Sequence, residues 1–150
     1  MEIERKFLID ALPEDIDKYN YHDIEQAYLN RAPVVRIRKQ DDEYYLTYKG
    51  KGSMIREEYN LPLNKASYEH LLTKADGIVI TKRRYLIPLD EKHTIELDEF
   101  HGIYEGLLLA EVEFESKEDA EGFEPPAWFG KDVTFSPMYH NSVMSNTKSV

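Results

Sequence analysis

Charged residues recur at every second position in several short segments of this sequence, and this spacing is the feature best suited to chemistry. Residues 1–8 read Met-Glu-Ile-Glu-Arg-Lys-Phe-Leu, so that Glu2, Glu4 and Lys6 occupy alternate positions. Successive side chains of a β-strand point to opposite faces, and these three therefore share one face. One face of the first predicted strand thus carries a charge at every position.

The same arrangement returns along the chain. The carboxylates on such rows are Glu2, Glu4, Glu58, Glu96, Asp98, Glu111 and Glu113, and the bases are Lys6, Arg36, Arg38, Lys49, Arg56, Lys82 and Arg84. Bases dominate some strands and carboxylates others. Guanidinium and ammonium groups bind polyanions, whereas clustered carboxylates hold a divalent cation that bridges such an anion. The pattern therefore indicates a site for a polyanion and a metal ion.

Two alternatives involve no ligand. The charged rows could be the solvent face of an open antiparallel sheet, or they could pair as buried salt bridges. Neither alternative requires bases and carboxylates to be segregated. An unpaired charge in a closed bore costs several kcal/mol, so charged rows in a bore require water, metal or ligand among them.

The elements that must position these rows follow from alternation and turn signals. Eight strands, joined mostly by tight turns, are predicted over 1–8, 23–29, 34–39, 43–49, 54–63, 78–89, 93–100 and 107–115. Helices are predicted over 12–20 and 64–75 and from 116 onward, with a helical turn near 139–144. Such a chain forms an α+β fold: an eight-stranded antiparallel closed β-barrel with a polar tunnel and flanking helices. The apolar rows, among them Ile37, Leu97 and Val112, would pack against those helices.

Composition is consistent with one folded domain over residues 1–150. Hydrophobic residues make up 41% of the chain, the net charge is −10 and there is no cysteine, which excludes disulfides and thiolate metal sites. No apolar segment has the length of a signal peptide or membrane span, so we expect a soluble, cytoplasmic protein. The acidic balance argues against nucleic acid or a membrane as partner, although a pocket can carry the opposite sign.

Taken in order, the charged motifs resemble the CYTH superfamily, also called triphosphate tunnel metalloenzymes. They are Glu2-x-Glu4-x-Lys6, Arg36-x-Arg38, Lys49-Gly50, Arg56-x-Glu58, Lys82-x-Arg84, Glu96-x-Asp98 and Glu111-x-Glu113. Each motif is weak alone, but the ordered set over residues 1 to about 115 is specific. The family's final Asp-Val-Thr is present at 132–134, whereas Met138-Tyr139-His140-Asn141 replaces its Arg-Tyr-Ser-Asn.

The resemblance assigns roles residue by residue. It implies that Glu2, Glu4, Asp98, Glu111 and Glu113 hold Mg²⁺ or Mn²⁺, and that Lys6, Arg36, Arg38, Lys49, Arg56, Lys82 and Arg84 bind the phosphates. Catalytic roles fall to Lys6, to Tyr28 as a hydrogen-bond partner of Lys6 or of a phosphate, and to Glu58, which would orient a neighbouring base or water.

The function expected from this resemblance is metal-dependent hydrolysis of a triphosphate, most simply inorganic tripolyphosphate to pyrophosphate and phosphate. Cyclisation of ATP to cyclic AMP is the enzymatic alternative, although nothing in the sequence identifies an adenine pocket. A catalytically silent polyphosphate- or nucleotide-binding module is the alternative from another class. The partner is in each case a small polyanion, tripolyphosphate or a nucleoside triphosphate, and a homodimer stays open.

Overall fold

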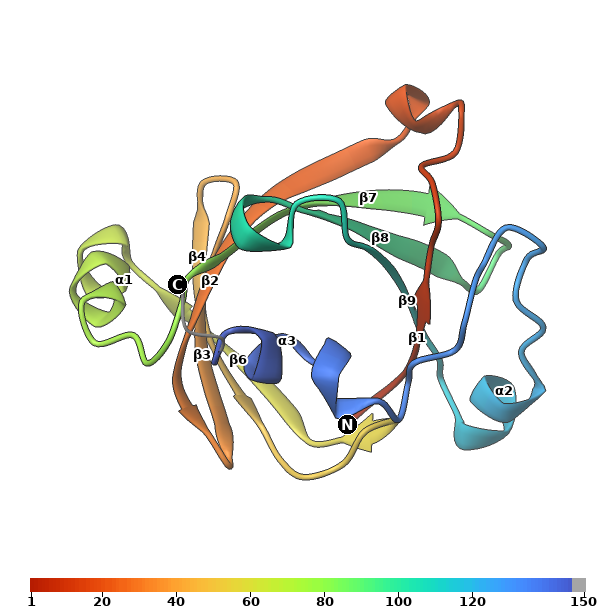
Figure 1. Cartoon of the computed structure of the whole chain (residues 1–150). Helices are drawn as coiled ribbons and strands as arrows, with labels where there is room; N and C mark the ends of the chain where they lie inside the picture. The colour runs from red at the N-terminus through yellow and green to blue at the C-terminus, as the bar shows by residue number, and fades with distance from the viewer. Residues whose placement is uncertain (147–150) are drawn as a thin grey trace.

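One antiparallel sheet, curled into a ring, forms the body of the protein. The computed structural model describes residues 1–146, and Figure 1 looks through the ring. Its nine strands are β1 (Glu2–Leu8), β2 (Asn20–Arg31), β3 (Val34–Gln40), β4 (Glu43–Lys49), β5 (Ile55–Arg56), β6 (Glu58–Leu63), β7 (Ile80–Pro88), β8 (Thr94–Phe100) and β9 (Leu108–Glu113). They follow the order β5-β1-β9-β8-β7-β2-β3-β4-β6.

The ring nearly closes through one interrupted strand. β5 pairs with β1, bringing Arg56 opposite Glu2, and β6 pairs with β4, bringing Glu58 opposite Lys49. Only Glu57 separates β5 from β6 along the chain. The barrel predicted from the sequence is therefore confirmed, but the single strand predicted over 54–63 is two strands, and the described sheet has nine strands rather than eight.

Three short α-helices accompany the sheet: α1 (Lys65–Leu72), α2 (Lys117–Gly122) and α3 (Asn141–Met144). α1 and α2 lie outside the ring, whereas α3 lies across its opening (Figure 1). The Asn64 side chain caps α1 by accepting a hydrogen bond of 2.7 Å from the Ser67 amide. The helix predicted over 12–20 is shorter in the structure, where only the 3-10 turn η1 (Ile16–Lys18) forms.

The hydrophobic core lies between the outer wall of the ring and the elements packed on it. Leu97 and Val112 are fully buried in one cluster with Ala120 of α2, and Ile37 is buried with Tyr68 of α1. These apolar side chains alternate along their strands with the charged rows. The predicted arrangement is thus observed, with apolar side chains toward the flanking helices and charged side chains toward the bore.

The C-terminal segment docks against the ring through hydrogen bonds that its backbone carbonyls accept. It contains the 3-10 turn η3 (Pro137–Tyr139) and then α3. The Ile78 amide donates to the Ser145 carbonyl at 2.7 Å, and Arg31 Nε donates to the Ser142 carbonyl at 2.9 Å. Gly77 has a φ of +91°, and a Cβ there would collide with the Ser145 carbonyl. A glycine is therefore required where this segment meets the sheet.

His93 joins the β7–β8 turn to α2. Its Nδ1 lies 2.9 Å from Asp90 Oδ2, and its Nε2 lies 2.9 Å from Asp119 Oδ2. Hydrogen bonds to Asp90 and to Asp119 favour the doubly protonated ring and raise the pKa of His93. The protonated imidazole therefore stabilises the attachment of α2.

This pairing predicts a pH-dependent stability. Folding raises the pKa of His93. Its contribution to the free energy of unfolding is therefore fully present below the ordinary histidine pKa, and it is lost as the pH rises through the raised pKa of the folded state. His93→Gln should cost about 0.5–1 kcal/mol more at pH 5.5 than at pH 8.5, measured by urea unfolding. His70→Gln, on the exposed side of α1, is the control. An equal cost of His93→Gln at both pH values would contradict this role.

Candidate active site

A polar cavity of about 220 Å³ occupies the bore of the ring. It is lined by all the residues that the sequence analysis assigned to metal, phosphate or catalysis, except Asp98. They come from β1, β2, β3, β4, β5, β6, β7 and β9. The strands therefore bring together residues separated by more than a hundred positions, as strand alternation predicts.

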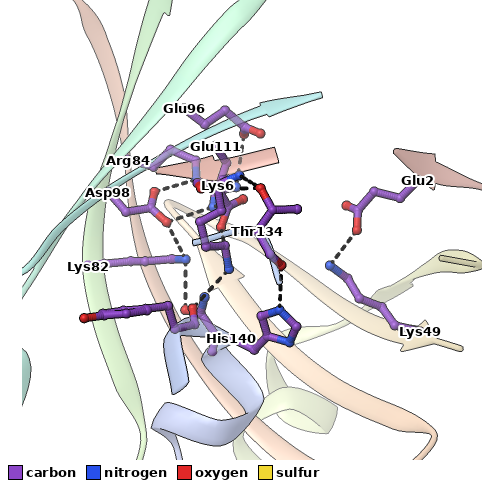
Figure 2. Close-up of polar contacts among 12 residues, drawn as sticks. Glu2, Lys6, Lys49, Lys82, Arg84, Glu96, Asp98, Glu111, Thr134 and His140 are labelled. Carbon is purple, nitrogen blue, oxygen red and sulfur yellow. Dashed lines mark hydrogen bonds and ion pairs between the residues drawn. The ribbon is translucent and has the colours of Figure 1, made fainter. Parts of the chain in front are cut away.

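A network of ion pairs, drawn in Figure 2, joins several residues that line one side of the cavity to Asp98. Asp98, with no exposed surface, contacts Lys82 Nζ at 2.7 Å and Arg84 Nε at 2.7 Å. Arg84 also reaches Glu96 at 3.0 Å and Glu111 at 3.3 Å. Burial opposes the ionisation of Asp98, but Arg84 and Lys82 outweigh it and hold the pKa of Asp98 below its usual value.

Asp98 therefore differs from the other residues predicted to bind metal. Each of its two carboxylate oxygens already accepts a hydrogen bond from Arg84, and one also accepts from Lys82. It lies behind the cavity wall, where it fixes two bases that line the cavity. Burial lowers the pKa of Lys82 to about 7, with Asp98 acting in the opposite direction.

Lys6 and Lys49 each contact carboxylates at the cavity. Lys6 Nζ lies 3.4 Å from Glu111 and donates to the Tyr139 carbonyl at 3.1 Å. Lys49 Nζ lies between Glu2, at 3.0 Å, and Glu58, at 3.3 Å. Burial opposes ionisation of Glu111, but Lys6 and Arg84 outweigh it and hold the pKa of Glu111 well below its usual value.

Two carboxylates of the cavity lack a basic partner in the part of the chain that the structure describes. Glu4 and Glu113 form no ion pair within residues 1–146. Burial and the neighbouring Glu111 raise the pKa of Glu4 to about 7, and burial with Glu4 raises the pKa of Glu2 to about 8. Burial, followed by the charge of Glu96, also raises the pKa of Glu113. Excess negative charge of this kind is what a divalent cation would relieve.

The donor set fits a hard metal ion by its chemistry. Glu2, Glu4, Glu111 and Glu113 offer carboxylate oxygens, the ligands preferred by Mg²⁺ and Mn²⁺. Within residues 1–146 no three acidic or histidine side chains already converge at metal-binding spacing. Mg²⁺ takes only one or two carboxylates and keeps several waters, so a fully assembled cage is not required.

Three arginines of the cavity lack an acidic partner among the described residues. In the described chain, Arg36, Arg38 and Arg56 form no ion pair, and neutral oxygens accept their hydrogen bonds. Burial, with Arg36 and Arg84 nearby, lowers the pKa of Arg38 to about 9, so this group remains charged at neutral pH. Guanidinium groups whose charge is not compensated favour the binding of anions.

Tyr28 and Glu58 have different surroundings. Tyr28 is buried and lines the cavity together with Lys6 and Arg38. Glu58 accepts from Asn60 at 2.9 Å in addition to its contact with Lys49. Glu58 is thus held between Asn60 and Lys49.

The sequence analysis did not identify several neutral residues that support the site. Gln26 and Thr47, both fully buried, hold Arg38 and Arg36. Asn141 accepts hydrogen bonds from Gln26 and Lys82. Gln26 shares a strand face with Tyr28, which was a usable signal, whereas α3 brings in Asn141 from the far end of the chain.

Comparisons with known proteins agree with this site. The sequence model of the CYTH domain family matches residues 1–143. An inorganic triphosphatase of Nitrosomonas europaea is 35% identical over 147 residues, covering 96% of each chain. An inorganic triphosphatase of Acetivibrio thermocellus is 36% identical, covering 94% of this chain and 90% of the relative.

Solved structures share the fold. The crystal structure of the inorganic triphosphatase NE1496 superposes with a TM-score of 0.73 at 33% identity, covering 99% of this chain and 96% of that chain. A Hippeastrum protein, proposed to be an adenylyl cyclase and described as having a dominant triphosphatase activity, gives a TM-score of 0.58. It covers 81% of this chain and 83% of that chain, and at 15% identity this second likeness shows the fold alone.

The buried network makes a prediction about Asp98. Asp98→Asn leaves Lys82 and Arg84 buried without their shared carboxylate, so the free energy of unfolding in metal-free buffer should fall by about 3–5 kcal/mol. Asp23→Asn is the matched control. Asp23 also pairs with a base of β7, Arg83, at 2.9 Å, but the Asp23 side chain is 58% exposed. That change should cost about 0–1 kcal/mol. Similar costs for the two variants, measured by urea unfolding, would show that Asp98 has no such role.

Proposed function

Because this chain belongs to the CYTH domain family, we propose that it is a metal-dependent triphosphatase that hydrolyses inorganic tripolyphosphate to pyrophosphate and phosphate. The observation that carries the proposal is the division of charge in the bore. Arginines that have no acidic partner in the described chain, and carboxylates that have no basic one there, line one cavity. A substrate that is itself a polyanion accompanied by divalent cations satisfies both sets.

The phosphate chain would lie along the basic side chains. Within residues 1–146, Arg36, Arg38 and Arg56 have no acidic partner to displace, and they would bind phosphate oxygens directly. Lys6, Lys49, Lys82 and Arg84 already contact carboxylates and would add positive potential around the chain. In phosphoryl transfer the protein mainly positions the groups and stabilises charge, which such a cavity supplies.

The metal would be held by Glu2, Glu4, Glu111 and Glu113, with Asp98 as a support behind Lys82 and Arg84. We propose Mg²⁺ or Mn²⁺ on the basis of the all-oxygen donor set. When bound, such an ion neutralises phosphate charge and lowers the pKa of coordinated water.

The chain's own residues would act on charge, orientation and water. Lys6, held between Glu111 and the Tyr139 carbonyl, would stabilise charge that develops on a phosphate oxygen. Tyr28 would donate a hydrogen bond to a phosphate. Glu58 would hold Lys49 in the geometry in which its ammonium group meets the substrate.

The alternatives are less well supported. The Hippeastrum likeness indicates the shared fold and gives no separate support for cyclic AMP synthesis. A silent binding module has no specific observation in its favour, because the relatives that cover most of this chain are named as triphosphatases. Assays for cyclic AMP and for released phosphate on the same sample separate these three functions.

Several expectations remain predictions. They are the identity of the metal, the absence of nucleic acid partners, a homodimer and the cytoplasmic location. Within residues 1–146 no helix has the length and apolar character of a membrane span.

The carboxylates without basic partners provide the first test of activity. Glu4→Gln and Glu113→Gln each remove a negative charge that the metal needs, so each should lower kcat/KM for tripolyphosphate at least about 100-fold. Glu69→Gln, on the exposed face of α1, should leave it unchanged. Phosphate release is the measurement. Near wild-type turnover by both cavity variants would contradict the assignment of the metal site.

Removal of the metal provides the second test. Phosphate release from tripolyphosphate should stop in EDTA and return when Mg²⁺ or Mn²⁺ is added in excess, because phosphate charge is then neutralised again. The same samples should keep their far-UV circular dichroism, since ion pairs within the protein hold the bore together. Full turnover in EDTA would contradict metal dependence.

A further inference from the structure

The basic side chains of the bore are held in two different ways. Lys82 and Arg84 on β7 are held by carboxylates, at 2.7 Å from Asp98 in both cases. Arg36 and Arg38 on β3 are held by neutral groups instead. A carboxylate partner cancels the charge that it positions, whereas a neutral acceptor leaves it in place.

Gln26 is the neutral group that holds Arg38. Its Oε1 accepts hydrogen bonds from Arg38 Nε at 2.9 Å and Nη2 at 2.7 Å, the same two-donor fork that a carboxylate would engage. Its Nε2 donates to Asn141 Oδ1 at 2.9 Å, and the same Oδ1 accepts from Lys82 Nζ at 3.2 Å. Gln26 has no exposed surface.

The orientations of the Gln26 and Asn141 side-chain amides follow from their neighbours. Lysine and arginine side chains only donate hydrogen bonds. Asn141 must therefore turn its oxygen toward Lys82, and Gln26 its oxygen toward Arg38. The Gln26 nitrogen is then the group left to donate to Asn141, which completes the network. A glutamate at position 26 would have no such donor and would bring an acceptor against the Asn141 oxygen.

Thr47 holds Arg36 in a similar way. Its fully buried hydroxyl accepts from Arg36 Nη2 at 3.1 Å and donates to Asn60 Oδ1 at 2.6 Å. Within the described chain, Arg36 Nε is the buried side-chain nitrogen left without a hydrogen-bond partner. The Arg36 residue is only 7% exposed and lines the cavity.

We propose that Gln26 and Thr47 are positioning residues that aim Arg38 and Arg36 into the cavity while leaving their charge for the substrate. This inference rests on the proposed function, because it takes the phosphates of the substrate as the anion that Arg36 and Arg38 meet. Gln26 and Thr47 act through the arginines and are not themselves catalytic. Asn141 links Gln26 to the C-terminal segment and thereby orients it.

The test compares an added charge inside the bore with the same charge outside it. Gln26→Glu keeps the shape of the side chain but pairs Arg38 with a carboxylate. It should weaken tripolyphosphate binding, measured by calorimetry in EDTA, and raise KM by about 10-fold or more, with a smaller change in kcat. The control, Asn20→Asp, adds the same charge at the exposed start of the same strand and should leave affinity and KM within about twofold.

A second pair of variants removes the hydroxyl without adding charge. Thr47→Val matches the threonine in shape but lacks the oxygen that holds Arg36, and it should raise KM by about 10-fold. Thr47→Ser retains the oxygen and should restore KM to within about threefold of wild type. This pair also decides the proposal if Gln26→Glu fails to fold.

The outcomes separate this inference from the proposed function. Wild-type affinity and KM in folded Gln26→Glu, or equal KM values for Thr47→Val and Thr47→Ser, would overturn the positioning role while hydrolysis stands. Failure of the wild-type protein to release phosphate would instead overturn the proposed function. The binding measurements would still decide whether Gln26 and Thr47 hold an anion site.

Discussion

The central constraint on this structure is the cost of keeping ionised side chains inside a ring of strands. An ion without a partner in such a space loses its hydration, and the effective penalty is several kcal/mol per ion. The protein meets much of this cost internally, through Asp98 with Lys82 and Arg84 and through Lys49 with Glu2 and Glu58. What remains uncompensated is divided by sign, with arginines from β3 and β5 and carboxylates from β1 and β9. In the function proposed above, that division is what would allow the bore to bind a polyanion together with a divalent cation.

A few structural features of the fold separate the uncompensated positive charges from the uncompensated negative charges. Strand alternation sends one row of each strand inward, and antiparallel pairing sets carboxylates and bases side by side, as with Lys6 opposite Glu111. The interruption at Glu57 lets one segment pair first with β1, as β5, and then with β4, as β6, which brings Arg56 next to Glu2. α3 then lies across the opening and supplies Asn141, which contacts both Lys82 and Gln26. Stability and function are thus linked, because the groups that position the bases also hold the end of the chain.

Much of this was predictable from the sequence, because alternation is a local pattern. The barrel, the polar bore and the convergence of the charged rows follow from period-two spacing in the strands, and the structure agrees with each. The break at Glu57 was not predictable, since both halves of 54–63 have the same alternation and only pairing with two different neighbours separates them. Asp98 looked equivalent to Glu96 by spacing, but its position behind Lys82 and Arg84 depends on the register of β7 and β8. Gln26, Thr47 and Asn141 are uncharged and escaped a search for charged chemistry, although their importance lies in that neutrality.

We propose above that the uncompensated arginines bind the phosphates of the substrate and that the uncompensated carboxylates bind its metal ion. The most direct measurement is a crystal structure of the Glu58→Gln variant, chosen to slow turnover, with tripolyphosphate and Mn²⁺, whose anomalous scattering locates the metal. The account predicts phosphate oxygens on the guanidinium groups of Arg36 and Arg38, and a manganese peak beside Glu4 and Glu113. Phosphates bound outside the bore, or manganese away from these carboxylates, would contradict it.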